Sequence, residues 1–297
     1  MSTTQSIAPA GPAAPARTVS RARRVKNRLF TFALYVCGFL ALLPLFFIVL
    51  FIVLRGIKAL NWDFFTQTPT VPGLPGGGIS QAFVGTAIII GIAILISVPL
   101  GILSAIYLAE YGKGKFAAAV RFTAEILLST PSIVAGAVIW SLVVLTLGSF
   151  SGFAASLAIS VIMWPIITRA TEEVLRLVRE ELREGALALG LPRWKVILRI
   201  VLPTASAGIF TAVMLAVARG LGETAPVLLT ALGNDFFSTN PFQPMDAIPL
   251  RVYNYAQSAV VSQPPMAFAG AICLLVIVLA LSITARVISS RQQRRVR

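Results

Sequence analysis

The chain has 297 residues, of which 57% are hydrophobic and only 12% are charged, against about 25% charged residues in ordinary soluble proteins. The net charge of +14 comes from Lys and Arg clustered between apolar segments and at both chain ends. No separate soluble segment offers the basic face that nucleic-acid binding requires, so nucleic acid is excluded as a partner. These properties predict an all-α membrane protein.

The predicted elements begin with a tail over residues 1–28, which is rich in Ala, Pro and Ser and then basic, and which we expect to be disordered. The apolar run 29–54 is longer than the ~7–15 apolar residues of a cleavable signal peptide, so we predict a retained first span. Five further runs complete a six-helix membrane domain over 29–290, and a basic tail follows at 291–297. These runs are 82–109, 122–147, 153–168, 204–231 and 266–288.

Alternation of six spans places both termini and the segments 110–121 and 169–203 on one side of the membrane. That side holds 21 Lys and Arg residues and the other side three, so the positive-inside rule predicts that both termini are cytoplasmic. The external segments 62–80 and 235–265 are rich in Pro and Gly and predict loops, with a short helix near 252–260. Their acids Asp63, Asp235 and Asp246 are expected to be solvated, or to contact a substrate-binding protein.

The third predicted span is broken by Pro131, next to Ser129, Thr130 and Ser132. These hydroxyls could line a transport pathway or could only satisfy backbone groups freed by the proline, and the sequence leaves both open. Nearer the start of this span, Arg121 and Glu125 have the spacing of a local i,i+4 ion pair.

The cytoplasmic segment 169–203 predicts an amphipathic helix over 172–189, a turn at Gly190, and a second helix over 193–202 that leads to Pro203. Such a helix could lie on anionic lipid. The five acids and seven bases of the whole segment 169–203 favour a groove on another protein instead.

Two charges, Arg219 and Glu223, stand within the fifth predicted span, where one charge costs roughly 2.5–3.5 kcal/mol on insertion scales. They could simply pair with each other, but Arg before Glu is the weaker order for an i,i+4 pair. The guanidinium fork suits an oxyanion, and the residues alone do not choose among phosphate, sulfate and molybdate. Glu223 would keep that anion from being trapped, and Thr224 is a further pathway candidate.

A longer pattern joins Glu184, Gly185, Ala186 and Gly190 to the sequence IVLP at 200–203. This pattern resembles the EAA loop of ABC importer permeases (E-A-A, three residues, G, nine residues, I-x-L-P), with Gly185 in place of the first alanine. The resemblance implies a type I, MetI-like permease fold in the cytoplasmic membrane and a loop that docks into a cleft of a separate ATPase. It implies a turn role for Gly190 and a polar contact for Glu184, while Ala186 and Pro203 belong to the same motif. No GxxxxGK[ST] occurs, so ATP and Mg are expected on that partner, with no cofactor or metal on this chain.

Three stretches are similar to PstA-type permeases of the bacterial phosphate importer: RGLGETAPVLLTALGN from Arg219, STPSIVAGAVIW over 129–140, and Gly85-Thr86. The resemblance covers about residues 80–285. It implies phosphate transport with Arg219 and Glu223 in the pathway, a PstC-type second permease, a PstB-type ATPase dimer and a PstS-type phosphate-binding protein.

Other functions remain as alternatives to this one. They are a permease for another oxyanion and the PstC-type subunit itself. A membrane-embedded enzyme is disfavoured because the sequence has no histidine and no nucleophile–base pair in a span. A passive channel would have no use for a loop that docks an ATPase.

Overall fold

The computed structural model describes residues 21–71 and 76–295, and this part of the chain is helical apart from connections and one isolated bridge between Leu232 and Met245. The membrane-length elements are α1 (Arg21–Gly56), α3 (Ser80–Ile106) with η2 (Tyr107–Tyr111), α7 (Gly152–Arg176), α10 (Leu202–Leu221) and α13 (Gln263–Arg295). The shorter ones are η1 (Ile57–Ala59), α2 (Trp62–Thr66), α4 (Lys115–Ser129), α5 (Ser132–Ile139), η3 (Trp140–Val144), α6 (Leu145–Leu147), α8 (Glu180–Ala188), α9 (Arg193–Val196), η4 (Ile197–Val201), α11 (Ala225–Ala231) and α12 (Ile248–Ala256).

Five helical segments of the described chain are long and apolar enough to cross a membrane: 25–59, 80–111, 152–176, 193–221 and 263–290. A sixth candidate consists of α4 followed by α5 to α6, which are bent by 108° at the predicted break around Pro131. The all-α fold with six apolar segments is therefore confirmed, with the third segment sharply bent.

Both ends of the predicted membrane domain are helical further than the sequence suggested. Helix α1 begins at Arg21 and α13 continues to Arg295, whereas tails were predicted over 1–28 and 291–297. Residues 1–20 of the first tail lie outside the described residues. Ala, Arg, Lys and Gln are good helix formers, and a helix already nucleated by an apolar span extends through them at little cost.

Two predicted helices have different boundaries in the structure. Helix α7 continues to Arg176 rather than ending at 168, because Thr168, Thr171 and Glu172 are buried against neighbouring helices rather than solvated. The predicted amphipathic helix 172–189 is consequently two pieces, the end of α7 and the separate helix α8. The short helix predicted near 252–260 is α12, which begins at Ile248.

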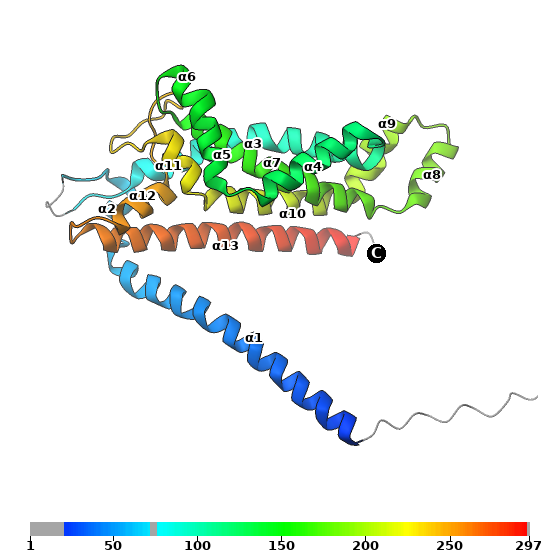
Figure 1. The fold of residues 1–297 in the computed structure, drawn as a ribbon, viewed down its shortest axis with the longest axis horizontal. Coiled ribbons are helices and arrows are strands. Elements are labelled where there is room, and N and C mark those ends of the chain that lie inside the picture. Colours follow the sequence, from blue (N-terminus) through cyan, green and yellow to red (C-terminus); the bar gives the residue numbers. More distant parts are fainter. Residues whose placement is uncertain (1–20, 72–75, 296–297) are drawn as a thin grey trace, which may run out of the picture. The chain divides into compact units, whose positions relative to one another are not determined.

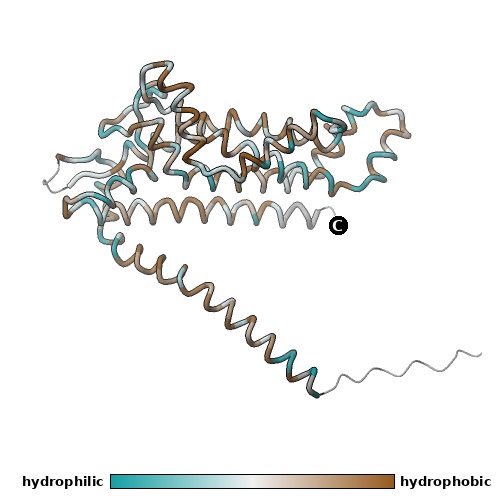
Figure 2. Tube along the Cα trace, viewed as in Figure 1, coloured by the Kyte–Doolittle hydropathy of each residue, from teal (hydrophilic) through white to brown (hydrophobic). Residues whose placement is uncertain are grey.

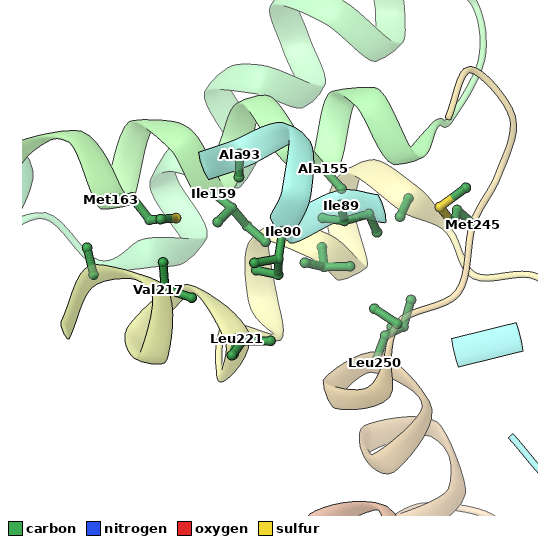
Figure 3. Close-up of a cluster of buried hydrophobic side chains, with 14 of the residues drawn as sticks. Ile89, Ile90, Ala93, Ala155, Ile159, Met163, Val217, Leu221, Met245 and Leu250 are labelled. Atoms are coloured by element: carbon green, nitrogen blue, oxygen red, sulfur yellow. The ribbon is translucent and has the colours of Figure 1, made fainter. Parts of the chain in front are cut away.

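Helices α3, α7 and α10 pack together around the main core (Figure 1). Figure 3 shows Ile89, Ile159 and Leu221, one from each of these helices, in a single cluster of buried side chains. Since lipid is as apolar as this core, the helices associate through close packing and small residues rather than through removal from water. At Gly220 a Cβ atom would meet Ile159 and Met163 side-chain atoms at 3.1 Å, so the missing side chain lets α10 approach α7.

Residues 21–51 form a compact unit of their own, apart from the unit that begins at Ile52. In this part of α1 the apolar side chains are exposed on all sides, as expected for a helix surrounded by lipid or by another membrane chain. Figure 2 shows the hydrophobic residues along this helix and along the other long helices, and hydrophilic residues around α8.

The expected local pair between Arg121 and Glu125 is wrong, because both side chains reach across to α7. Arg121 Nε donates to Glu172 Oε1 at 2.9 Å, and Arg169 pairs with Glu125 at 3.2 Å and with Glu172 at 3.0 Å. Arg176 adds a bond of 2.7 Å to the same carboxylate. Glu172 is only 2% exposed, so its charge is held inside the protein by three arginines.

At the end of the bundle that carries α12, Asp246 is fully buried and not solvated as predicted. Its Oδ2 accepts hydrogen bonds from Arg251 Nε at 2.6 Å and from Gln81 Nε2 at 2.9 Å. Arg251 also pairs with Asp235, which is exposed, and Asp63 is exposed as predicted. Burial raises the pKa of Asp246 to about 6, although the Arg251 charge opposes this shift.

Asp246, through Gln81 of α3, and two further hydrogen bonds fix the connection 232–247 and the start of α12 to the membrane helices. The Thr86 Oγ1 atom of α3 accepts a hydrogen bond from the Ile248 amide at 2.8 Å, and the Gly152 amide donates to the Gln243 carbonyl at 3.0 Å. These bonds tie the connection to the starts of α3 and α7. The aspartate therefore contributes to the fold rather than to an exposed binding surface.

We predict that Arg251→Gln destabilises the protein by about 3–5 kcal/mol at pH 8, because it leaves the Asp246 carboxylate buried without its counter-charge. The folded pKa near 6 lies above the 3.8 of an ordinary aspartate, so the folded state binds more protons between these values. The contribution of this group to stability is therefore full below about pH 4 and falls as the pH rises through 6. Thermal unfolding of the detergent-purified variant at pH 5 and 8 should show the larger loss at pH 8. Adding Asp246→Asn should reduce that difference, and an equal loss at both pH values would contradict this explanation.

Candidate functional site

The predicted fifth span is broken between α10 and α11, at the sequence that carries Arg219 and Glu223. The Gly222 amide donates to the Arg219 carbonyl at 3.0 Å, and the Glu223 amide donates to the Gly220 carbonyl at 3.3 Å, which closes the last turn of α10. Helix α11 then starts with Pro226 in its first turn, where a missing N–H is tolerated. The expectation of one continuous helix over 204–231 is therefore wrong, because glycines and a proline interrupt it.

Arg219 and Glu223 form an ion pair across this break, with Arg219 Nε 3.4 Å from Glu223 Oε1. The two partners differ in exposure, since the arginine side chain is 57% exposed and the glutamate 13%. Within residues 21–71 and 76–295, the terminal guanidinium nitrogens of Arg219 donate to no other group. The pair thus leaves most of the guanidinium fork available to a further ligand.

Arg219 lies at the edge of a cavity of about 190 Å³. Two other predicted site residues, Thr130 and Ser132, line the same cavity from either side of the Pro131 break. The remaining lining is apolar and comes from Leu127, Leu128, Val134, Ala135, Val138, Ile139, Val161, Ile162 and Ile166. The structure therefore brings Arg219 together with two of the predicted hydroxyls. It leaves Ser129, Glu223 and Thr224 outside the cavity lining, with Thr224 half-buried just before α11.

The hydroxyls near Pro131 have different roles. Ser129 Oγ donates to the Glu125 carbonyl at 2.9 Å and Thr130 Oγ1 donates to the Ile126 carbonyl at 2.7 Å, so both satisfy backbone oxygens at the end of α4. Ser129 is accounted for by this bend alone. Thr130 both satisfies the bend and lines the cavity, and the Ser132 hydroxyl lines the cavity without a hydrogen bond to any other described residue.

The chemistry of this cavity suits a loosely held anion. A volume of about 190 Å³ exceeds the ~30 Å³ of a water molecule several times, and one cation with two hydroxyl groups supplies the polar contacts. A guanidinium presents several N–H donors in a planar fork that matches an oxyanion. Because the other walls are apolar, the Arg219 charge acts through a lower dielectric than in water.

A second candidate site is the coupling segment, residues 169–203, at the far end of the bundle (Figure 1). Helix α8 and helix α9 are joined by a turn in which Gly190 has φ +78°, a left-handed conformation that favours glycine. Glu184 and Gly185 are exposed on α8, whereas Ala186 is buried against residues of α9 and η4 such as Val196 and Val201. The exposed carboxylate is free to contact a partner, while Ala186 and Gly190 shape the segment.

Pro203 lies in the first turn of α10, directly after the π-helical turn η4. The helix from Arg193 runs through this turn into α10 without a break, as the span 193–221 shows. Pro203 has no N–H to donate, and a helix tolerates that in its first turn. The predicted lead from the coupling segment into a membrane helix is therefore confirmed.

Sequence reasoning missed Arg183, the residue before Glu184. Its side chain is 14% exposed and forms an ion pair of 3.0 Å with Glu110 of η2, which is 6% exposed. It also donates to the Leu175 carbonyl at 2.7 Å and the Val178 carbonyl at 3.1 Å, where α7 ends. The partner is 73 positions away, so no local spacing could reveal the contact.

Residues 97–294 match the model of the family described as binding-protein-dependent transport system inner membrane component. The phosphate transport system permease protein PstA of Xylella fastidiosa is 45% identical over 241 residues, which are 80% of this chain and 84% of the relative.

Two solved transporter structures share the fold. The chain matches a component of a bacterial alginate ABC transporter with a TM-score of 0.67 at 16% identity, covering 91% of this chain and 97% of the other. It matches a component of the inward-facing MetNI methionine ABC transporter with a TM-score of 0.58 at 18% identity, covering 72% and 95%. These matches confirm the predicted MetI-like fold of ABC importer permeases. By sequence, the chain belongs to the binding-protein-dependent transport system inner membrane components and, among them, to the PstA phosphate transport permeases.

Proposed function

We propose that this chain is one permease half of an ATP-driven importer that moves inorganic phosphate across the cytoplasmic membrane. The observation that carries the proposal is the Arg219 guanidinium, 57% exposed at a helix break and facing a cavity with two hydroxyl groups. The PstA relatives, which are named for phosphate transport, supply the choice of anion. In this proposal both termini and the coupling segment are cytoplasmic, as the distribution of Lys and Arg predicts.

Arg219 would offset the free energy that phosphate loses when it leaves water at membrane depth. Glu223, 3.4 Å away, would keep that attraction moderate, since transport requires an anion to leave as well as to bind. Thr130 and Ser132 would donate hydrogen bonds to the phosphate oxygens. The chain is thus a transport subunit, and no step of chemistry is assigned to its residues.

The importer requires an ATPase and a substrate-binding protein as partners, as permeases of this family do. We assign these roles to a PstB-type ATPase dimer and a PstS-type phosphate-binding protein, with ATP and Mg on the ATPase. Each chain carries a single coupling segment, so two docking clefts call for two permeases. A PstC-type chain would supply the second segment and would close the exposed side of Arg219.

A guanidinium with hydroxyl donors would also bind sulfate or molybdate, so the choice of phosphate rests on the PstA relatives. The same relatives favour the PstA-type over the PstC-type subunit. We expect proteoliposomes that contain both permeases and the ATPase, supplied with the binding protein, to take up labelled phosphate but not labelled sulfate or molybdate. Uptake of sulfate or molybdate instead of phosphate would overturn the proposal.

Arg219→Gln should reduce phosphate uptake by more than tenfold while the complex still assembles, because glutamine keeps donor capacity but removes the charge. The double variant Arg219→Gln with Glu223→Gln separates transport from structure, since it leaves no unpaired glutamate in the break. We expect the double variant to assemble at wild-type yield and to remain inactive. If phosphate uptake returns in the double variant, the pair serves structure alone.

The coupling role is tested by two glycines of the same segment. At Gly190 an L-residue costs about 1–2 kcal/mol in the left-handed conformation, so Gly190→Ala should weaken ATPase binding by roughly tenfold. Gly185→Ala is the matched control, because a Cβ there has no neighbour within 4 Å and alanine favours a helix. Glu184→Arg should also weaken ATPase binding. The Glu184 side chain is exposed, so the substitution reverses a charge at the surface that meets the partner. Co-purification of the ATPase measures all three, and equal retention by Gly190→Ala and Gly185→Ala would refute the turn role.

A further inference from the structure

Two parts of the coupling segment, the end of α7 and α8, meet η2, which ends the second membrane helix and is distant from them in sequence. Arg183 joins all three, because it pairs with Glu110 in η2, with Glu180 in α8, and with two carbonyls at the end of α7. The last carbonyls of a helix lack the usual intrahelical partners, so a cation there can donate hydrogen bonds to them. Its charge also interacts favourably with the negative end of the helix dipole. A movement of α8 away from this position would break the bonds to Glu110 and to the two carbonyls, but not the Glu180 pair, which lies within α8.

A second arginine continues the connection from η2 to α4. The carbonyl oxygen of Leu108 in η2 accepts a hydrogen bond from Arg121 Nη2 at 2.8 Å. Arg121 also holds the buried carboxylate of Glu172 in α7 at 2.9 Å. The π-helical geometry of η2 places Leu108 and Glu110 in one short turn, so this turn contacts Arg121 of α4 and Arg183 of α8.

Helix α4 links this cluster to the cavity. Arg121 lies near the start of α4, and Thr130 follows its last residue, about 14 Å further along at 1.5 Å per residue. Thr130 bonds to the last turn of α4 and lines the cavity with Arg219. A shift of α4 as a rigid helix would therefore move one wall of the cavity.

We propose that Arg183 and Arg121 are positioning residues for transport, which keep α8 in register with α4 so that a displacement of the coupling segment changes the cavity. The inference rests on the proposed function and names how the ATPase partner would act on the anion site. Neither arginine contacts the anion. Each acts through η2, which connects them, and through the two buried carboxylates of Glu110 and Glu172.

The test is the amount of ATP hydrolysed per phosphate transported in proteoliposomes that hold the complete complex. Arg183→Gln and Arg121→Gln should each raise this ratio at least tenfold, with ATPase still bound and hydrolysis within about twofold of wild type. Arg183→Gln combined with Glu110→Gln should raise the ratio no further than Arg183→Gln alone, because Arg183→Gln already removes the Arg183–Glu110 pair. Arg121→Lys should recover part of the coupling, since lysine keeps the charge near Glu172.

Arg176→Gln is the matched control, because Arg176 bonds to the same Glu172 at 2.7 Å but stays within α7. It should leave the ratio unchanged. If the arginine variants lower yield, hydrolysis and transport together at a constant ratio, the residues only support the fold and the inference fails. The inference also fails if the double variant Arg183→Gln with Glu110→Gln has a clearly higher ratio of ATP hydrolysed to phosphate transported than Arg183→Gln alone. Failure of the wild-type complex to transport phosphate would instead reject the proposed function, so the two failures are distinguishable.

Discussion

A membrane segment must pair its backbone N–H and C=O groups within the protein, and this constraint governs where the chain can leave a helix. At the α10–α11 break, the amides of Gly222 and Glu223 donate hydrogen bonds to carbonyl oxygens three residues earlier. At the Pro131 break, the hydroxyls of Ser129 and Thr130 donate hydrogen bonds to backbone carbonyls of α4. Both breaks border one cavity, which Thr130 and Ser132 line at the Pro131 break and Arg219 lines at the end of α10. These two breaks therefore lie where a solute would need polar contacts.

The exposure of its side chain separates Arg219 from the arginines that bridge separate elements of the described chain. Arginines that bridge separate elements are well covered, with Arg251 at 8%, Arg183 at 14% and Arg121 at 28% exposure. Each of these holds a carboxylate that is at most 6% exposed. Arg219 differs from these three because its side chain is 57% exposed, and it differs from the similarly exposed Arg176 because it lines a cavity. A residue that served only to neutralise Glu223 would not need to present its guanidinium to a cavity.

Much of this arrangement follows from the sequence, and what does not follow has a physical reason. The apolar runs located the membrane segments, and Pro131 and Gly190 located the break in the third segment and the turn of the coupling segment. The charged residues Arg219 and Glu223 marked the candidate site, although not the break beside it. The interruption after Leu221 was missed because apolar residues continue on both sides of Gly222, so hydrophobicity does not change there. The burial of two acids was also missed, since Glu172 was placed at the start of a cytoplasmic helix and Asp246 in a solvated loop. Their partners Arg121 and Gln81 lie 51 and 165 positions away, beyond any local spacing rule.

The central claim is that phosphate passes through the cavity beside Arg219. The most direct measurement is whether phosphate protects a cysteine placed in the cavity from chemical modification. In a complex with Cys37 and Cys273 replaced by serine, Ser132→Cys is exposed to a thiol-specific reagent during turnover, with phosphate or with sulfate. Ser129→Cys serves as the control, since Ser129 lies beside the same break but does not line the cavity. We predict that phosphate slows modification at position 132 several-fold, that sulfate does not, and that position 129 reacts equally in both. Modification of position 132 at the same rate with either anion would contradict passage through this cavity.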